Sequence, residues 1–190
     1  MPVPDPLVIG TRGSELALWQ ANFVRSRLEA HGHRVEIETI LTRGDQVQDV
    51  PISEIGDESV FTKELDRALL AGDVHVAVHS LKDLPSQLPE GITLAAIGER
   101  EDPGDAFVPH PSVGAGLRDL PEGATLATAS LRRRAQIKSW RPDLTVVPVR
   151  GNVDTRLEKL DDSSWHGMVL AMAGLLRMGL SARIREAFPV

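Results

Sequence analysis

Stretches typical of β-strands alternate with stretches typical of α-helices along most of this chain, and this alternation restricts the fold more than any other feature. In the second half, strand patterns lie at 124–128, 145–149 and 167–171, and helical patterns lie at 130–140 and 153–160, with helical segments following as far as Phe188. Strands that alternate with helices predict an α/β fold, in which helices cover a parallel or mixed sheet.

The first half of the chain follows the same order. Its predicted strands cover 7–9, 35–40, 74–78 and 92–97, and its predicted helices cover 14–29, with Ser14 as N-cap, and 62–70, ended by Gly72. The region 46–59 has no clear period and is predicted to be a loop. Charged and turn-forming residues from Glu99 to Asp105 are typical of a hinge. We therefore expect two domains, at 1–102 and 103–190.

Charged side chains gather where four of the predicted strands end. The groups are Arg12, then Lys82 with Asp83, then Arg132 with Arg133, and finally Arg150. If the strands are parallel, these ends open on the edge where open α/β sheets bind ligands. Each group alone is equally typical of a solvated surface or a weak surface ion pair. Their common position favours an arginine-lined site for a polyanion.

Residues beside these strand ends suit the same site. Ser130 and Asn152 are expected to cap the helices that they precede, which adds backbone N–H groups and the positive end of a helix dipole. Gly151 allows close approach of the backbone to a ligand. Arg156 lies one helical turn beyond Asn152 and is expected near the same opening.

Composition excludes several classes of protein. The chain has no cysteine, which excludes disulfides and thiolate catalysis within these residues, and its histidines lack the spacing of metal ligands, so no metal site is predicted. A net charge of −6 argues against a nucleic-acid surface. No apolar run reaches the ~20 residues of a membrane helix, and the start of the chain, rich in proline, is unlike a signal peptide. A cytoplasmic location is expected.

Ordered motifs make the sequence resemble the porphobilinogen deaminase (hydroxymethylbilane synthase) family. They include GTRGSELALWQA at 10–21, AVHSLKDLP at 77–85 and RGNVDTR at 150–156, with further matches at 42–45, 61–65, 99–107, 130–133 and 171–179. The resemblance covers nearly the whole chain. It implies two α/β domains of the periplasmic-binding-protein type (type II), with mixed sheets flanked by helices and a cleft between them.

The resemblance also implies a function. The family enzyme is a transferase that polymerises porphobilinogen to hydroxymethylbilane, with loss of ammonia, in tetrapyrrole and haem biosynthesis; this chain would be its front two domains. Asp83 would be the catalytic carboxylate, which stabilises positive charge on the pyrrole nitrogen. The residues expected to bind the carboxylate arms and pyrroles of porphobilinogen, of the growing oligopyrrole and of the cofactor are Arg12, Ser14, Lys63, Ser80, Lys82, Thr128, Ser130, Arg132, Arg133, Arg150, Gly151, Asn152 and Arg156.

Departures from the family pattern leave a second reading open. Glu58 stands where many members have a cation, and Ala129 replaces a hydroxyl side chain. The family's dipyrromethane cofactor is attached to a cysteine of a third domain, and this chain has no cysteine. The first domain would also lack a return strand, which would expose a sheet edge through which chains could associate. The alternative is a non-catalytic binding protein for small polycarboxylate anions.

Overall fold

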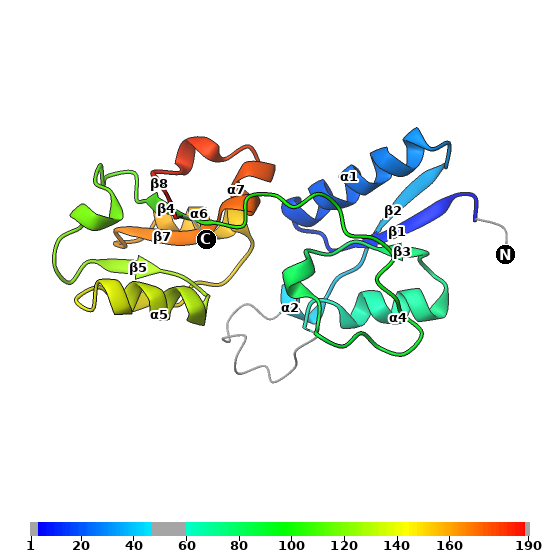
Figure 1. Ribbon diagram of the computed structural model, residues 1–190, viewed down its shortest axis with the longest axis horizontal. Coiled ribbons are helices and arrows are strands. Elements are labelled where there is room, and N and C mark those ends of the chain that lie inside the picture. Colours follow the sequence, from blue (N-terminus) through cyan, green and yellow to red (C-terminus); the bar gives the residue numbers. More distant parts are fainter. Residues whose placement is uncertain (1–3, 47–59, 189–190) are drawn as a thin grey trace. The chain divides into compact units, whose positions relative to one another are not determined.

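A computed structural model of the chain describes residues 4–46 and 60–188. The chain divides into two compact units, Met1–Gly98 and Glu99–Val190, and each is described by itself (Figure 1). Most of the predicted loop at 46–59, and with it Glu58, lies outside the described residues.

The first unit is built on a parallel sheet with the strand order β2-β1-β3. Its strands are β1 (Leu7–Thr11), β2 (Val35–Thr39) and β3 (Val76–Ala77). The central strand β1 is apolar and buried along most of its length, and Ile9 faces Ile37 on one side and Val76 on the other. A strand that is buried on both faces is typical of parallel sheets covered by helices.

Helices cover both faces of this sheet. They are α1 (Glu15–Ala30), the short α2 (Arg43–Gln46) and α4 (Lys63–Ala71), and the 3-10 turn η1 (Leu81–Asp83) follows β3. Figure 1 shows α1 and α4 on opposite sides of the strands. The predicted cap is confirmed, because the Ser14 hydroxyl accepts a hydrogen bond from the Ala17 N–H at 3.3 Å.

The second unit contains a mixed sheet with the order β6-β5-β7-β4-β8. Its strands are β4 (Asp105–Pro109), β5 (Thr125–Ala127), β6 (Thr145–Val147), β7 (Gly167–Ala171) and β8 (Glu186–Phe188). Strand β5 runs parallel to β6 and β7, whereas β4 runs antiparallel to β7 and β8.

The core of the second unit lies on both faces of its sheet. Its helices are α5 (Leu131–Trp140), α6 (Val153–Asp161) and α7 (Met172–Arg177), with 3-10 turns η2 (Leu117–Asp119) and η3 (Ser181–Arg183). Successive residues of β7 belong to opposite clusters: Met168 packs in the cluster that contains Leu157 of α6, and Val169 in the one that contains Ile137 of α5. This alternation follows the two-residue period of a strand.

A histidine joins the starts of two neighbouring strands in each unit. The backbone N–H of His75 donates to the Val8 carbonyl at 2.9 Å, and its ring Nδ1 accepts the Val8 N–H at 2.9 Å. His166 makes the same two bonds with Thr125, at 2.9 and 3.1 Å. In the first unit β1 lies between β2 and β3, and in the second unit β5 lies between β6 and β7, so each unit contains a core of three parallel strands.

The structure corrects three predictions of local structure. The predicted strand at 92–97 does not form: Leu94 and Ile97 are 46% and 66% exposed, and no described strand lies beside them to complete a ladder. Strand β4 was not predicted, and it begins at Asp105, the last residue of the predicted hinge. The end of the predicted helical region is strand β8, which pairs with β4.

Candidate functional site

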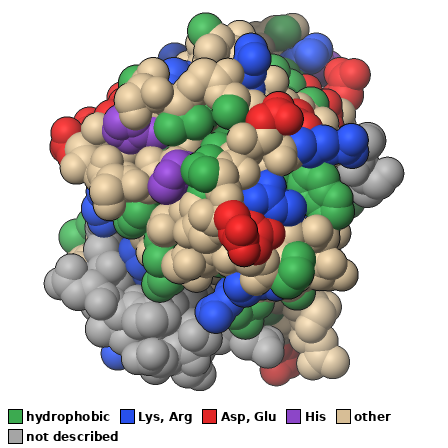
Figure 2. Space-filling model, turned by 90° about the vertical axis from the view of Figure 1, so that its left-hand side faces the viewer, with side chains coloured by type: hydrophobic (Ala, Val, Ile, Leu, Met, Phe, Trp, Pro, Cys, Tyr) green, Lys and Arg blue, Asp and Glu red, His purple; other side chains and the backbone are tan. Residues whose placement is uncertain are grey.

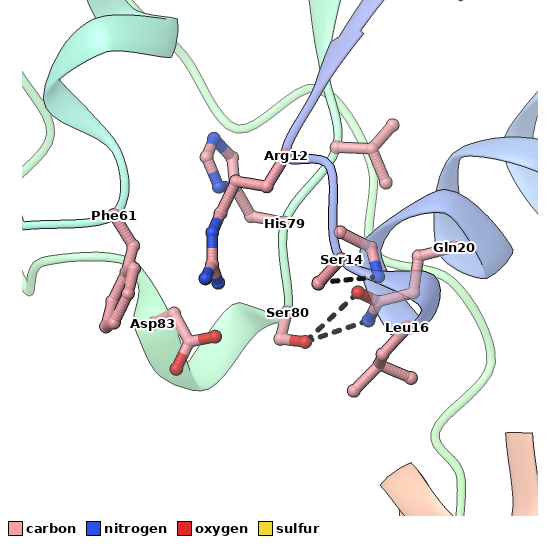
Figure 3. A pocket seen from close by; sticks show the side chains of 10 residues that line it. Arg12, Ser14, Leu16, Gln20, Phe61, His79, Ser80 and Asp83 are labelled. Atoms are coloured by element: carbon pink, nitrogen blue, oxygen red, sulfur yellow. Dashed lines mark hydrogen bonds between the residues drawn. The ribbon is translucent and has the colours of Figure 1, made fainter. Parts of the chain in front are cut away.

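An open pocket lies in the first unit, at the carboxyl ends of β1 and β3 (Figure 3). It is lined by Arg12, Ser14, Leu16, Ala17, Gln20, Phe61, Val78, His79, Ser80 and Asp83. Because β1 and β3 are parallel, the segments that follow them meet at one edge of the sheet. Four residues predicted for the site are thereby brought together: Arg12, Ser14, Ser80 and Asp83.

Arg12 is held on two sides. Its guanidinium forms a two-point ion pair with the Asp45 carboxylate, in which Nε donates to Oδ2 at 3.2 Å and Nη2 donates to Oδ1. The guanidinium carbon also lies 4.2 Å from the centre of the Phe61 ring, within the range of a cation–π contact. In Figure 3 the Arg12 side chain points into the same space as the Asp83 carboxylate.

Asp45 is itself fixed by its own segment. Its Oδ2 accepts the Thr42 hydroxyl at 2.7 Å. Burial raises the pKa of Asp45, but the hydrogen bonds from Arg12 and Thr42 and the charge of Arg12 outweigh burial and lower that pKa below its usual value. Asp45 is therefore a charged partner that orients Arg12.

Phe61 reaches Arg12 because its ring packs against the backbone of Gly44. A Cβ atom at Gly44 would lie 2.3 Å from the Phe61 ring, so no larger residue fits there unless the ring moves. The Gly44 N–H also donates to the carbonyl of Val60 at 3.0 Å. The motifs around residues 44 and 61, distant in sequence, thus form one support for Arg12.

Ser80 and Ser14 are anchored to α1. Nε2 of Gln20 donates a hydrogen bond to the Ser80 hydroxyl at 2.8 Å (Figure 3). Ser14 uses its hydroxyl to cap α1. Asp83, partly buried, lies in η1 directly beyond β3. The wall of the pocket thus combines hydroxyl groups, a carboxylate and a guanidinium.

His79 is a pocket residue that the sequence did not single out. Burial lowers its pKa below the usual histidine value, Arg12 lowers it further, and the charge of Asp83 acts in the opposite direction. Its Nε2 is buried and has no hydrogen-bond partner among the described residues. A neutral imidazole therefore stands beside Arg12 and Asp83.

Two predicted binding residues do not line this pocket. Lys63 is the first residue of α4 and Lys82 lies in η1, and both side chains are exposed. The placement of Lys82 beside Asp83 in sequence does not put both side chains into the pocket, because a 3-10 turn directs successive side chains in different directions.

In the second unit, Arg132 and Arg133 share one carboxylate. Nη2 of Arg132 donates to Oδ2 of Asp105 at 2.9 Å, and Nη2 of Arg133 donates to Oδ1 at 2.8 Å. Both arginines lie in the first turn of α5, and Asp105 is the first residue of β4. The two predicted clamps for substrate carboxylates are therefore already paired with a carboxylate of the protein.

Thr128 and Ser130, which follow β5, form hydrogen bonds with backbone groups. Thr128 is buried, and its hydroxyl donates to the Val169 carbonyl at 3.3 Å. The Ser130 hydroxyl accepts the Arg133 N–H at 3.3 Å, as expected for an N-cap. Both side chains fix the start of the helix that carries Arg132 and Arg133.

The segment between β6 and α6 holds the remaining predicted residues. Gly151 has φ +119°, a conformation that favours glycine. Arg156 folds back onto the segment, since its Nε donates to the Gly151 carbonyl at 2.7 Å, and Nζ of Lys159 donates to the Arg150 carbonyl at 3.0 Å. Asn152 occupies the N-cap position of α6, but its side chain makes no capping hydrogen bond.

Charges of both signs are mixed on the surface seen in Figure 2, where basic and acidic side chains are interspersed. Among the described helices, none is both long and apolar enough to cross a membrane. The arrangement in each unit suits small anions: a guanidinium held in place by an aspartate, close to backbone N–H groups at a helix start.

Comparisons with known proteins match the chain to one family. The family model described as porphobilinogen deaminase, dipyromethane cofactor binding domain, matches residues 7–190. Porphobilinogen deaminase of Syntrophomonas wolfei is 51% identical over 185 residues, which cover 96% of this chain and 60% of that protein. The enzyme of Albidiferax ferrireducens is 52% identical over 182 residues, covering 96% and 57%. The chain thus spans roughly three fifths of the length of these curated relatives.

Solved structures show a likeness of fold. The methionine-binding protein MetQ matches with a TM-score of 0.51 and 14% identity, over 98% of this chain and 79% of that one. A periplasmic substrate-binding protein of an ABC transporter from Coxiella burnetii matches with a TM-score of 0.50 and 14% identity, over 95% and 78%. The expected α/β fold of the periplasmic-binding-protein type is confirmed.

Proposed function

This chain belongs to the porphobilinogen deaminase family, and we propose that it is the substrate-binding and catalytic part of an enzyme that joins porphobilinogen units into hydroxymethylbilane. The observation that carries the proposal is the pocket of the first unit, where the Asp83 carboxylate and the Arg12 guanidinium point into one space (Figure 3). Porphobilinogen brings a pyrrole nitrogen and two carboxylate arms, which are the groups that such a pair recognises.

Asp83 acts on the reacting pyrrole. As the bond between carbon and the amino nitrogen breaks and ammonia leaves, positive charge develops on the pyrrole nitrogen. A fixed carboxylate beside this nitrogen stabilises the charge as it forms, and it does so more effectively in a partly buried pocket than in water. The new carbon–carbon bond then forms, and the proton displaced from the attacking pyrrole is lost to solvent.

Arginines and hydroxyl groups bind the carboxylate arms and the pyrroles. Arg12 supplies the guanidinium in the first unit, with Ser14 and Ser80 beside it. Arg132, Arg133, Arg150 and Arg156 supply guanidinium groups in the second. Lys63 and Lys82 reach bound oligopyrroles from the surface. Thr128, Ser130, Gly151 and Asn152 shape the backbone that carries the second set.

The described residues suit a bound dipyrromethane. This group carries the same carboxylate arms, and Nε of Arg133 is a buried donor with no partner among the described residues. When bound, the cofactor supplies the pyrrole end on which the chain is extended. These 190 residues contain no cysteine, so the thioether that attaches the cofactor requires a residue outside this sequence. The cytoplasmic location stays a prediction.

Complementation of the chain tests the proposal. We would mix it with the portion of the Syntrophomonas wolfei enzyme that this chain does not match, and measure consumption of porphobilinogen and release of ammonia. Turnover that Asp83→Asn abolishes is the expected result. If the chain binds porphobilinogen but no mixture turns it over, the alternative of a binding protein for polycarboxylate anions becomes the better reading.

A further inference from the structure

Asp105 is the link between two neighbouring arginines of the second unit. Each of its carboxylate oxygens accepts from a different guanidinium, at 2.9 Å from Arg132 and 2.8 Å from Arg133. Both distances are typical of charge-assisted hydrogen bonds. One aspartate at the start of β4 therefore fixes two arginines of α5.

The two arginines differ in exposure. The Arg133 side chain is 12% exposed and that of Asp105 is 13% exposed, whereas Arg132 is 59% exposed. Arg133 also donates to the Val169 carbonyl at 3.5 Å, and Arg132 donates to the Gln136 side chain at 2.8 Å. Arg133 thus joins α5 to the sheet, and Arg132 faces solvent with its position set by Asp105 and Gln136.

Asp105 remains charged in this environment. Burial raises its pKa, but the hydrogen bonds and charges of Arg133 and Arg132 outweigh burial and lower the pKa below the usual value. Two guanidinium groups and one carboxylate then leave the cluster with one net positive charge. Without Asp105, two adjacent cations would repel each other in a partly buried setting.

We propose that Asp105 is a positioning residue and determines the specificity of the arginine pair: it orients Arg132 toward a bound carboxylate and limits the pair to one net charge, which matches one carboxylate arm. This inference rests on the proposed function, in which Arg132 and Arg133 bind such arms. It assigns the aspartate a role in recognition that differs from direct contact with the substrate.

Calorimetric titration tests the role of Asp105. The probes are porphobilinogen and succinate, a flexible dicarboxylate, each titrated at several salt concentrations into the unaltered chain and into Asp105→Asn. We expect porphobilinogen to bind about tenfold more weakly to the variant, because a close bidentate contact depends on orientation. Succinate should lose much less affinity. The dependence of binding on salt should become steeper, because the variant carries one more net positive charge.

Asp143→Asn is the matched control. Asp143 forms a two-point pair with Arg141 in the same unit, at 2.8 and 2.7 Å, and belongs to neither candidate site. Its loss should lower thermal stability and leave the ratio of the two affinities unchanged. A purely structural Asp105 would behave in the same way as this control.

The outcomes separate the two proposals. If the unaltered chain binds porphobilinogen and Asp105→Asn keeps the same affinity ratio and salt dependence, the inference about Asp105 is wrong and the proposed function stands. If the unaltered chain binds no porphobilinogen, the proposed function fails, and the inference fails with it. If Asp105→Asn does not fold, Asp105→Glu serves in its place, because it keeps the charge and displaces the arginines. We then expect a lower ratio of the affinity for porphobilinogen to the affinity for succinate, without a change in salt dependence. An unchanged ratio would contradict the inference.

Discussion

Arg12 and Asp45 are joined by a two-point ion pair although 33 residues separate them in the chain. Arg12 follows β1 and Asp45 lies in α2, so the pair ties the pocket to the segment that begins beyond β2. The cation of the pocket is thus oriented before any ligand arrives. Such preorganisation reduces the entropy that binding costs.

Replacement of Asp45 by Asn should make the stability of the first unit less dependent on acid. The folded-state pKa of Asp45 is depressed, so its contribution is present above the unfolded value of 3.8 and is lost as pH falls through the lower folded value. At neutral pH, Asp45→Asn should cost about 1 kcal/mol, because the pair is partly open to solvent. Thermal unfolding of both proteins, followed from neutral pH to strongly acidic pH, measures this difference. Equal loss of stability in acid for both would contradict the assignment.

Asp83→Asn should abolish turnover in the complemented enzyme and leave the fold intact. The amide keeps the size of the side chain but lacks the charge that stabilises the pyrrole nitrogen, so the rate should fall at least about a hundredfold. The stability change should stay within about 0.5 kcal/mol, as for most substitutions at surface and pocket positions. Ammonia release and thermal unfolding give the two readouts. An active variant would remove Asp83 from its proposed role.

Gly151→Ala should disturb the segment that carries Arg150 and Asn152. An alanine at φ +119° is strained, and its Cβ would lie 3.0 Å from Cβ and Cγ2 of Thr155. We expect a loss of about 1–3 kcal/mol in stability and weaker binding of porphobilinogen. Gly123→Ala is the control, because Gly123 also has positive φ but has open space around its Cβ position. It should cost less stability and leave binding unchanged; equal effects of both variants on binding would refute the prediction.

Arg141→Lys should lower the melting temperature of the second unit by a few degrees. The guanidinium donates to the carbonyls of Leu117, Arg118 and Leu120, at 3.3, 3.0 and 3.1 Å, and also binds Asp143. An ammonium group has no planar fork and cannot keep all these bonds. The hydrogen bond from Arg141 lowers the pKa of Asp143 from 3.8 to about 2, so the contribution of this pair is fully present above pH 3.8 and is lost as pH falls from 3.8 through about 2. An unchanged melting temperature at neutral pH would contradict this account.

The sequence predicted the regular α/β part of the fold and failed where strands lack a local signature. Helices α1, α5 and α6 begin at residues of capping type, so their starts were predictable. Strand β4 is short and begins directly after Pro103 and Gly104. These two residues are typical of a turn, so the sequence pattern there did not indicate a strand. The residues at 92–97 have the composition of a strand, but a ladder also needs a neighbouring strand, which composition does not reveal.

The carboxyl ends of the strands were predictable as the position of the site, but the pairing of its side chains was not. Arg12 and Arg132 were visible as cations at strand ends. Their partners Asp45 and Asp105 lie 33 and 27 residues away along the chain, and only the folded backbone brings them together. Asp45 and Phe61 lie in the family motifs at 42–45 and 61–65, and this was the signal in the sequence that they matter for the site.

In the described part of each unit, a histidine joins the starts of two strands and makes the same pair of bonds to the neighbouring strand. It lies at the end of the strands opposite to the one from which Arg12 or Arg132 extends. The histidine bonds that join the strands therefore lie at the opposite end of the sheet from the residues that each unit offers to a ligand. Substitutions among the residues that follow the carboxyl ends of the strands therefore leave these histidine bonds, and the strand pairing that they support, in place.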